Sequence, residues 1–314
     1  MKRFIAVLLF AALFAFASCG EGGDVRLNFA TGGVTGTYYP LGGAMAAVIN
    51  ANTDISLTVM ATNASADNIR QLAAGDAHIA IVQNDVMSYA FYGTGFWPAG
   101  EEVTNLATLM SLYPETVQIV VPADSDIYSV ADLRGNRVSI GAPGSGVEAN
   151  TLQILAAYGL STDDITVFNL NFSDSANAMR DLMLDAFFIT AATPNTAIME
   201  LSTSRDLRIL ELSEAAIQSL LANYPFYVRV TVDSRDYDFV TSPVNTVAVQ
   251  ATLIATTDMD DQHAYDIVRT LIENQADIGH ARGAYITPQN AVQSISVDFH
   301  PGARRFFQSI GVLN

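Results

Sequence analysis

One segment decides the fold of this 314-residue chain: Ala30-Thr31-Gly32-Gly33-Val34-Thr35-Gly36-Thr37-Tyr38-Tyr39-Pro40-Leu41-Gly42-Gly43-Ala44. It follows an alternating apolar run, Val25–Phe29, which predicts a short strand. The glycines permit a tight turn, and Pro40 suits the first turn of a helix. Because the first N–H groups of a helix have no partner inside it, and the helix dipole reinforces them, this turn predicts an anion site. The alternative is a purely structural turn between strand and helix.

The same strand-turn-helix pattern recurs three times. The predicted strands are Thr58–Thr62, Arg137–Ile140 and Ala186–Ile189. Each is followed by helix-start signals: Ser65 as an N-cap, Ser145 with Glu148 as a capping box, and Thr193 as an N-cap with Pro194 at the first helical position. Ligands of open α/β sheets bind beyond the carboxyl ends of the strands, where all four turns lie.

Six motifs occur in order between about Asn28 and Gly311: Gly32-Gly33-x-x-Gly36-x-Tyr38-Tyr39-Pro40-Leu41-Gly42-Gly43, Ala80-x-Val82-Gln83-x-Asp85, Asp132-Leu133-x-Gly135-x-x-Val138-x-x-Gly141-Ala142-Pro143-Gly144-Ser145-Gly146, Asp185-Ala186-Phe187-Phe188, Tyr224-Pro225-Phe226-Tyr227 and His300-Pro301-Gly302-Ala303. As a set they resemble the TAXI family, the solute-binding proteins of tripartite ATP-independent periplasmic (TRAP) transporters. One departure is Thr62-Asn63-Ala64-Ser65, where the family usually has Thr-Gly-Gly-Ser.

The resemblance implies an α/β, two-lobed periplasmic-binding-protein fold of type II-like architecture, with a hinge and an interlobe ligand cleft. It implies closure on a small carboxylate such as glutamate, glutamine or 2-oxoglutarate, and membrane-embedded TRAP permease subunits as partners.

Length and composition fit two lobes, because 314 residues with 50% hydrophobic content can bury two α/β cores. We expect lobe I at residues 24–115 and 241–314, and lobe II at residues 116–240. The chain crosses between the lobes at Thr116–Val121 and returns at Val244–Thr256. Two crossings are what a hinge-bending binding protein needs.

The N-terminus predicts an export signal over residues 1–18, with two basic residues before the apolar run Phe4–Phe16. Phe16-Ala17-Ser18-Cys19 resembles a lipobox that leaves Cys19 lipidated, whereas Ala15-Phe16-Ala17 also fits ordinary cleavage before Ser18. We favour the lipoprotein because the only cysteine of the chain falls at this position. The expected location is extracytoplasmic, in the periplasm, with a lipid anchor.

The charge balance is strongly acidic. Without Lys2 and Arg3, 13 of the 15 basic residues remain against 32 acids, a net charge of −19. Such a surface excludes nucleic acid as a partner. It repels an anionic ligand at a distance, but salt screens that repulsion within about 8–10 Å, so helix termini dominate inside a cleft.

Lobe I supplies candidate ligand contacts from its first two turns. The candidates there are Gly33, Thr35, Gly36, Thr37, Tyr38, Tyr39, Ser65 and Asn68. Because Tyr38 and Tyr39 are adjacent, only one of them is expected to face the cleft. Two more candidates, Gln83 and Asp85, follow the predicted buried strand Ile79–Val82 and lie on the same side of it. Asp85 would suit an ammonium group, although it also fits a cap of the next helix.

Lobe II supplies candidates from its two turns, namely Gly144, Ser145, Gly146, Ala192, Thr193 and Pro194. Arginine is the usual bidentate partner of a carboxylate, but none lies in the four turns. Arg70 and Arg180 come nearest in sequence, and exposed helix positions are the expectation for both. The sequence thus predicts an anion held mainly by backbone N–H groups.

No enzyme, metal site or cofactor is expected. Pro143-Gly144-Ser145 fails the G-x-S-x-G nucleophile pattern, and the four histidines are scattered without metal-ligand spacing. His300-Pro301-Gly302 is expected to form a turn. The predicted function is therefore an extracytoplasmic solute-binding subunit that delivers a small carboxylate unchanged to a TRAP-type transporter. The alternatives are a ligand sensor for a membrane kinase or chemoreceptor and, less favoured, a secreted hydrolase.

Overall fold

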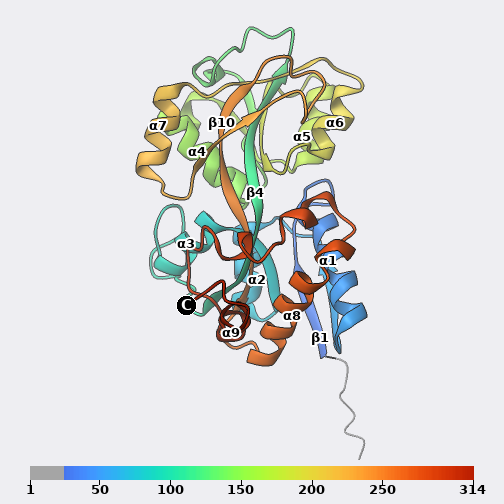
Figure 1. The fold of residues 1–314 in the computed structure, drawn as a ribbon. Coiled ribbons are helices and arrows are strands. Elements are labelled where there is room, and N and C mark those ends of the chain that lie inside the picture. Colours follow the sequence, from blue (N-terminus) through green and yellow to red (C-terminus); the bar gives the residue numbers. More distant parts are fainter. Residues whose placement is uncertain (1–24) are drawn as a thin grey trace, which may run out of the picture.

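The computed structural model describes residues 25–314, which form two lobes around one continuous ten-stranded sheet (Figure 1). The predicted signal peptide and Cys19 lie outside the described residues. Along the main path of the sheet the strand order is β2-β1-β3-β10-β4-β7-β5-β6, with β8 paired to β4 and β9 paired to β10. Within residues 25–314, no helix is long and apolar enough to cross a membrane.

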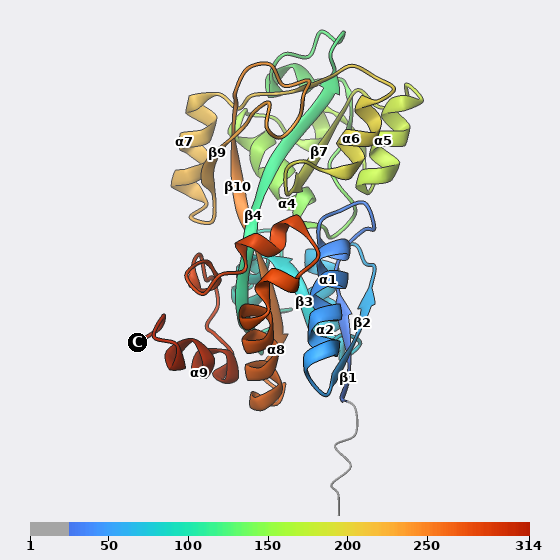
Figure 2. The same cartoon turned by 45° about the vertical axis from the view of Figure 1, so that its right-hand side comes forward.

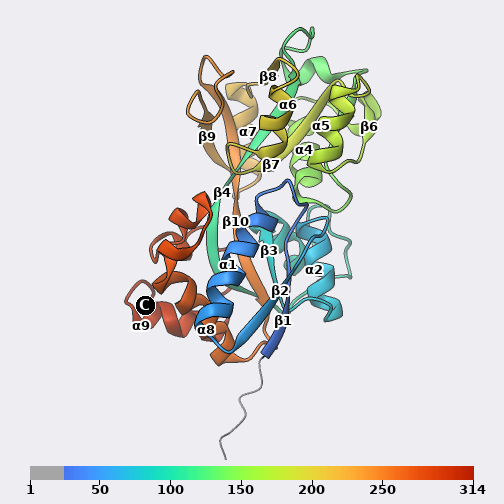
Figure 3. The ribbon, with the colours of Figure 1, turned by 90° about the vertical axis from the view of Figure 1, so that its right-hand side faces the viewer.

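Lobe I is built from the N-terminal and C-terminal parts of the described chain. Its strands and helices are β1 (Val25–Ala30), α1 (Tyr38–Asn52), β2 (Ile55–Met60), α2 (Ser65–Ala74), β3 (Ile79–Gln83), α3 (Asn84–Tyr92), α8 (Asp261–Glu273) and α9 (Pro301–Ser309), with short 3₁₀ turns at Gln275–Asp277, Ala281–Tyr285 and Asn290–Val292. The strands β1, β2 and β3 are parallel, so their carboxyl ends share the edge of the sheet that faces lobe II (Figure 3).

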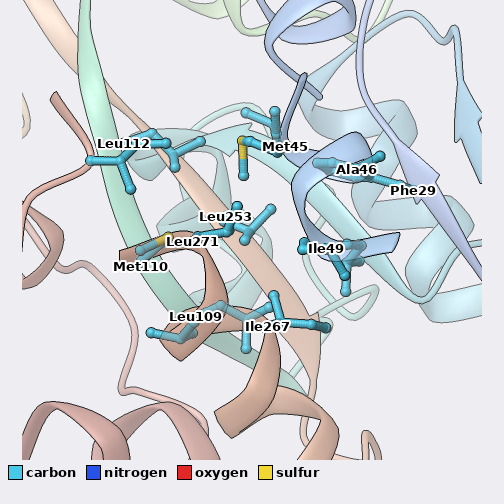
Figure 4. Close-up of a cluster of buried hydrophobic side chains, with 14 of the residues drawn as sticks. Phe29, Met45, Ala46, Ile49, Leu109, Met110, Leu112, Leu253, Ile267 and Leu271 are labelled. Carbon is cyan, nitrogen blue, oxygen red and sulfur yellow. The ribbon is translucent and has the colours of Figure 1, made fainter. Parts of the chain in front are cut away.

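The core of lobe I lies on both faces of this sheet. Figure 4 shows one face, where Met45 and Ile49 of α1 meet Leu253 and the α8 residues Ile267 and Leu271. The second face is covered by α2 and α3, whose apolar residues pack on β3. Burial of apolar surface contributes about 25 cal/mol per Å² to the free energy of folding. These two buried layers therefore stabilise the edge of the sheet from which the cleft loops project.

Lobe II has the same three-layer design. It contains β5 (Arg137–Ser139), α4 (Gly146–Ala157), β6 (Thr166–Phe168), α5 (Phe172–Arg180), β7 (Ala186–Ala191), α6 (Thr196–Ser202), β8 (Leu207–Ile209), α7 (Glu214–Asn223) and β9 (Val228–Val232), with 3₁₀ turns at Val130–Leu133 and Thr162–Asp164. Helices α4 and α7 cover one face of its sheet, and α5 and α6 cover the other (Figure 2). The parallel strands β5, β6 and β7 turn their carboxyl ends toward lobe I.

Two long antiparallel strands join the lobes. β4 (Leu106–Pro122) and β10 (Val244–Thr256) run through both of them, as Figure 1 shows. Their pairing register shifts between Gln250 and Thr252 and again between Leu253 and Ile254. Such irregularities bend and twist a strand pair, and the first of them lies next to the point where β4 passes between the lobes, since Gln250 pairs with Pro114. The predicted two-lobed α/β fold class is confirmed.

Two local predictions are wrong. The strand predicted at Thr58–Thr62 is β2 at Ile55–Met60, because it pairs along its whole length with β1, from Val25↔Ile55 to Ala30↔Met60. The turn predicted at His300 is the start of α9. The His300 ring nitrogen Nδ1 accepts a hydrogen bond from Gly302 N at 3.2 Å, and a proline at the first helical position completes the start signal.

Candidate functional site

A cavity of about 110 Å³ lies between the two lobes. Lobe I lines it with the loop before α1, the loop before α2 and the end of β3, while lobe II contributes the starts of α4 and α5 and the end of β7. The lining residues are Gly32, Gly33, Thr35, Gly36, Thr37, Tyr38, Thr62, Asn63, Ala64, Ser65, Gln83, Glu115, Ala142, Ser145, Gly146, Val147, Asn171, Phe172, Thr190 and Ala191.

Five helices begin at this cavity. Their N-cap residues, which all line it, are Thr37, Ala64, Gln83, Ser145 and Asn171. The first N–H groups of a helix have no partner within it, and each helix start carries roughly half a positive charge. A cavity surrounded by several such ends therefore favours a negatively charged occupant.

The loop before α1 behaves largely as the sequence predicts. Among the candidates of this first turn, Gly33, Thr35, Gly36, Thr37 and Tyr38 line the cavity. The loop is closed by a hydrogen bond from Gly36 N to Gly33 O at 2.9 Å. Of the adjacent tyrosines, Tyr38 lines the cavity, whereas Tyr39 is half-buried and lies outside the lining.

At the second turn, Ser65 lines the cavity, but its predicted role as N-cap is wrong. The N-cap is Ala64, at φ 69°, so the helix begins one residue earlier than predicted. Ser65 Oγ instead accepts a hydrogen bond from Gln83 N at 3.1 Å. The candidate Asn68 is structural. Its buried amide donates to Thr31 O and Ile81 O, at 2.6 and 2.7 Å, and so joins α2 to the end of β1 and to β3, outside the cavity lining.

At the third turn, the predicted N-cap is confirmed, since Ser145 Oγ accepts from Glu148 N at 3.2 Å. The Glu148 carboxylate accepts instead from Gly144 N at 2.8 Å, one residue before the position of a reciprocal capping box. Ser145 and Gly146 line the cavity. Gly144 lies outside the lining, where its carbonyl accepts from Ala66 N of lobe I at 3.0 Å.

The fourth turn differs most from its prediction. β7 extends to Ala191, and the helix begins at Thr196 with Asn195 as N-cap, so Thr193 and Pro194 do not start a helix. Thr193 Oγ1 donates to Asp236 at 2.6 Å, which fixes the loop against the β9–β10 connection. The candidates Ala192, Thr193 and Pro194 lie outside the cavity lining, and the preceding Thr190 and Ala191 take their place.

Asp85 also lies outside the lining. Its side chain is 1% exposed, sits in the first turn of α3, and accepts hydrogen bonds from Val86 N at 2.8 Å and from Asn150 Nδ2 of lobe II at 3.0 Å. Burial raises the pKa of this carboxyl to about 7, against the opposing effect of these hydrogen bonds. Asp85 therefore joins the two lobes beside the cavity instead of facing it.

The acidic group inside the cavity is Glu115, which the sequence reasoning missed. It is 2% exposed and accepts a hydrogen bond from the Tyr38 hydroxyl at 2.6 Å. Burial raises the pKa of the Glu115 carboxyl to about 8, more than the Tyr38 hydrogen bond lowers it. A single acid within the long apolar strand Leu106–Pro122 was the available sequence signal. Asn171 and Phe172 were missed as well, because the turn before α5 has no glycine-rich pattern.

Among the described residues, no basic side chain lines the cavity, and Glu115 is the one acidic side chain there. Arg70 is exposed, with its guanidinium 4.9 Å from the centre of the Trp97 ring. Arg180 is exposed as well and donates to Asn177 of its own helix at 2.7 Å. An anion in this cavity would thus be stabilised by the partial positive charge of the helix starts and by hydrogen bonds from N–H and hydroxyl groups.

The lobes are closed on each other around the cavity. Beside the hydrogen bonds from Ala66 to Gly144 and from Asn150 to Asp85, Gln153 Nε2 of lobe II donates to the Tyr89 hydroxyl of lobe I at 2.9 Å. Glycines allow the closest approaches: a Cβ atom on Gly146 would collide with the side-chain amide of Gln83.

Solved structures share this fold at low sequence identity. The alkanesulfonate-binding protein SsuA from Xanthomonas axonopodis pv. citri, bound to MOPS, matches with a TM-score of 0.53 and 16% identity, over 90% of this chain and 83% of that one. The periplasmic aliphatic sulphonate-binding protein SsuA from Escherichia coli gives 0.51 and 15%, over 90% and 83%. A binding protein component of an ABC phosphonate transporter from Pseudomonas aeruginosa gives 0.52 and 10%, over 84% and 78%.

These similarities confirm the predicted fold class, that of periplasmic binding proteins. They do not distinguish the TAXI family from other groups with this fold. The comparison with protein families is more specific, because one family matches residues 29–311, nearly the whole described chain. The chain belongs to the NMT1-like family.

Proposed function

We propose that the protein is an extracytoplasmic solute-binding protein that captures a small carboxylate between its lobes and delivers it to a membrane transporter. The observation that carries this proposal is the interlobe cavity at which five helices begin and which no cation lines among the described residues. Backbone N–H groups at helix starts suit a carboxylate, and each interaction with the helix dipole contributes roughly 0.3–1 kcal/mol or more when buried.

The ligand contacts that we propose are the predicted residues that line the cavity: Gly33, Thr35, Gly36, Thr37, Tyr38, Ser65, Gln83, Ser145 and Gly146. They come from both lobes, so binding favours the closed form over an open one. We propose residues 24–115 with 241–314, and 116–240, as the two lobes that move, with the hinge in β4 and β10.

A binding screen tests the ligand class. Protein that has been unfolded, freed of bound small molecules and refolded is titrated calorimetrically with glutamate, glutamine, 2-oxoglutarate and C4-dicarboxylates. Alkanesulfonates and a neutral sugar complete the panel, because two of the similar structures are named as sulfonate-binding proteins. We expect a carboxylate to bind most tightly. Preference for the sugar would contradict the anion site, and preference for a sulfonate would contradict the carboxylate assignment.

We propose a TRAP-type permease as the partner, on the strength of the resemblance to the TAXI family. The similar structures include a component of an ABC transporter. TRAP-type and ABC-type transporters can be distinguished by their source of energy. In proteoliposomes that contain the cognate permease, uptake of the ligand should need this protein and an ion gradient but no ATP. Strict dependence on ATP would contradict the TRAP assignment. Ligand-dependent signalling by a membrane kinase without any uptake would support the sensor alternative.

We further propose that the protein acts without chemical change of its ligand. Incubation of ligand with the protein should return the same compound by mass spectrometry, whereas a hydrolysed product would favour the hydrolase alternative. The location in the periplasm and the lipid on Cys19 are proposals from the N-terminal sequence. Intact-mass analysis of native protein should find an acylated Cys19 as first residue, and the Cys19→Ala variant should be released as soluble protein. A chain that starts unmodified at Ser18 would rule out the anchor.

A further inference from the structure

Three buried polar side chains form one face of the cavity. Gln83 on β3, Glu115 on β4 and Thr190 on β7 are 2%, 2% and 4% exposed, and all three line the cavity. The strand register places them on the same side of the sheet. Gln83 pairs with Ala251 and Glu115 pairs with Val249, and these two partners are two residues apart on β10. Thr190 pairs with Val117, which is two residues from Glu115 on β4. Residues two apart on a strand lie on the same face, and paired residues share that face.

These groups have unused hydrogen-bonding capacity. Within residues 25–314, Gln83 Oε1 and Thr190 Oγ1 are buried without a hydrogen-bond partner. Glu115 uses one carboxyl oxygen, Oε2, to accept from the Tyr38 hydroxyl. Buried polar atoms are normally paired, so an unpaired set that faces a cavity indicates the chemistry of the occupant. Here the set consists mainly of acceptors, which require a donor.

We propose that Glu115 and Gln83 bind the ammonium group of the ligand, so that the ligand is an α-amino acid and not the corresponding keto acid. This inference rests on the proposed function and deepens it. The carboxylate groups of the ligand would lie at the helix starts, and its ammonium group would lie against the sheet between the Glu115 carboxylate and Gln83 Oε1.

Electrostatics favours this division of the cavity. An ammonium group taken out of water needs an opposite charge and several acceptors, which Glu115, Gln83 and the Thr190 hydroxyl supply together. A keto acid offers only acceptors and would leave Gln83 Oε1 unpaired. Asp85, the other buried acid nearby, is already bonded to Asn150 and lies outside the lining.

Binding an amino acid at Glu115 should release a proton. The pKa of about 8 keeps the Glu115 carboxyl mostly protonated at pH 7 in this closed site. When an ammonium group takes the place of that proton, the carboxyl ionises and the proton passes to the buffer. In this step a neutral carboxyl group and an ammonium ligand form a carboxylate–ammonium pair and release one proton. A keto acid would release none.

Calorimetry tests the inference on the full-length mature protein. L-glutamate and 2-oxoglutarate are each titrated at pH 7 in bis-Tris and in Tris, cationic buffers that differ in ionisation enthalpy. We expect L-glutamate to bind more tightly and to release protons, and 2-oxoglutarate to release none. In Glu115→Gln, which keeps the size of the side chain, L-glutamate should bind about 10- to 100-fold more weakly without proton release. The affinity for 2-oxoglutarate should change by less than about threefold.

Asp85→Asn is the matched comparison, because it neutralises a buried acid between the same lobes but outside the cavity. It should change the affinity for both probes by the same factor. The inference is overturned if wild type binds 2-oxoglutarate as tightly as L-glutamate without proton release, or if Glu115→Gln leaves their affinity ratio unchanged. Proton release by wild type needs no variant, so poor folding of Glu115→Gln does not remove the test. If no anion of the screening panel binds at all, the proposed function itself fails.

Discussion

Substitution of Gly146 tests whether the lobes close on the ligand as the structure shows. Gly146 is the first residue of α4, in lobe II, and packs against the side-chain amide of Gln83 in lobe I. A Cβ at this position would overlap that amide and displace it. The overlap exists only when the lobes are together. We therefore expect Gly146→Ala to weaken ligand binding without lowering the stability of the unliganded protein.

The magnitude follows from the geometry. The overlapped atoms are the end of the flexible Gln83 side chain, which can turn aside, so the main cost is the loss of the hydrogen bond from Gln83 to the ligand, about 0.5–1.5 kcal/mol net. Every 1.4 kcal/mol is a factor of ten, so the ligand affinity of Gly146→Ala should fall about 2- to 12-fold. Gly146→Val adds two further methyl groups and should reduce binding below detection.

The assay is isothermal titration with the ligand found by the screen, supported by thermal unfolding without ligand. Gly43→Ala is the matched control, since Gly43 is an exposed residue of α1 and a Cβ there meets nothing within 4 Å. That variant should bind like wild type and gain roughly 0.5–1 kcal/mol in helix stability. Wild-type affinity in Gly146→Val would rule out closure of the lobes at the contact between Gly146 and Gln83.

Three further predictions concern closure, pH and the core of lobe II. Saturating ligand should reduce the radius of gyration in X-ray scattering and stabilise the protein by about 2.7 kcal/mol at 100-fold excess over Kd; identical scattering profiles would contradict hinge closure. Unliganded protein should lose stability between about pH 4 and 8, since the folded state holds protons on Glu115 and Asp85 that the unfolded state gives up, and Glu115→Gln should reduce the slope of this dependence in thermal unfolding. Tyr237→Phe should cost about 1–3 kcal/mol in urea unfolding, because the Tyr237 hydroxyl accepts from Asn195 N and donates to Gln118 Oε1, and both would be left buried and unpaired; a cost near zero would contradict this.

The features best predicted from the sequence are those that neighbouring residues determine. The glycine loop before α1 and the cap at Ser145 depend on neighbouring residues alone, so their signals are visible in the sequence. The helix predicted at Thr193 failed because its loop is held by Asp236 and by Tyr237, whose hydroxyl bonds to Asn195 N. Contacts about 40 residues away overrode a strong local start signal.

The site was harder to predict, because the cavity is made by pairing of distant strands. Asp85 and Glu115 are both buried acids close to the cleft, and the sequence pointed to Asp85 since it follows a strand that ends there. Glu115, on β4 where it pairs with β10, is part of the cavity lining, while α3 turns Asp85 toward Asn150. Burial and register, which a single sequence does not specify, decide between the two acids.

The most direct test of anion capture between the lobes is to identify the small molecule that purifies with the protein. Native mass spectrometry gives the mass of the complex, and mass spectrometry after denaturation identifies the released compound. We expect one small organic anion per chain, which rebinds unchanged to the refolded protein. A neutral sugar as the bound compound, or an anion that binds equally well when the Gly146→Val substitution obstructs the closed cavity, would contradict it.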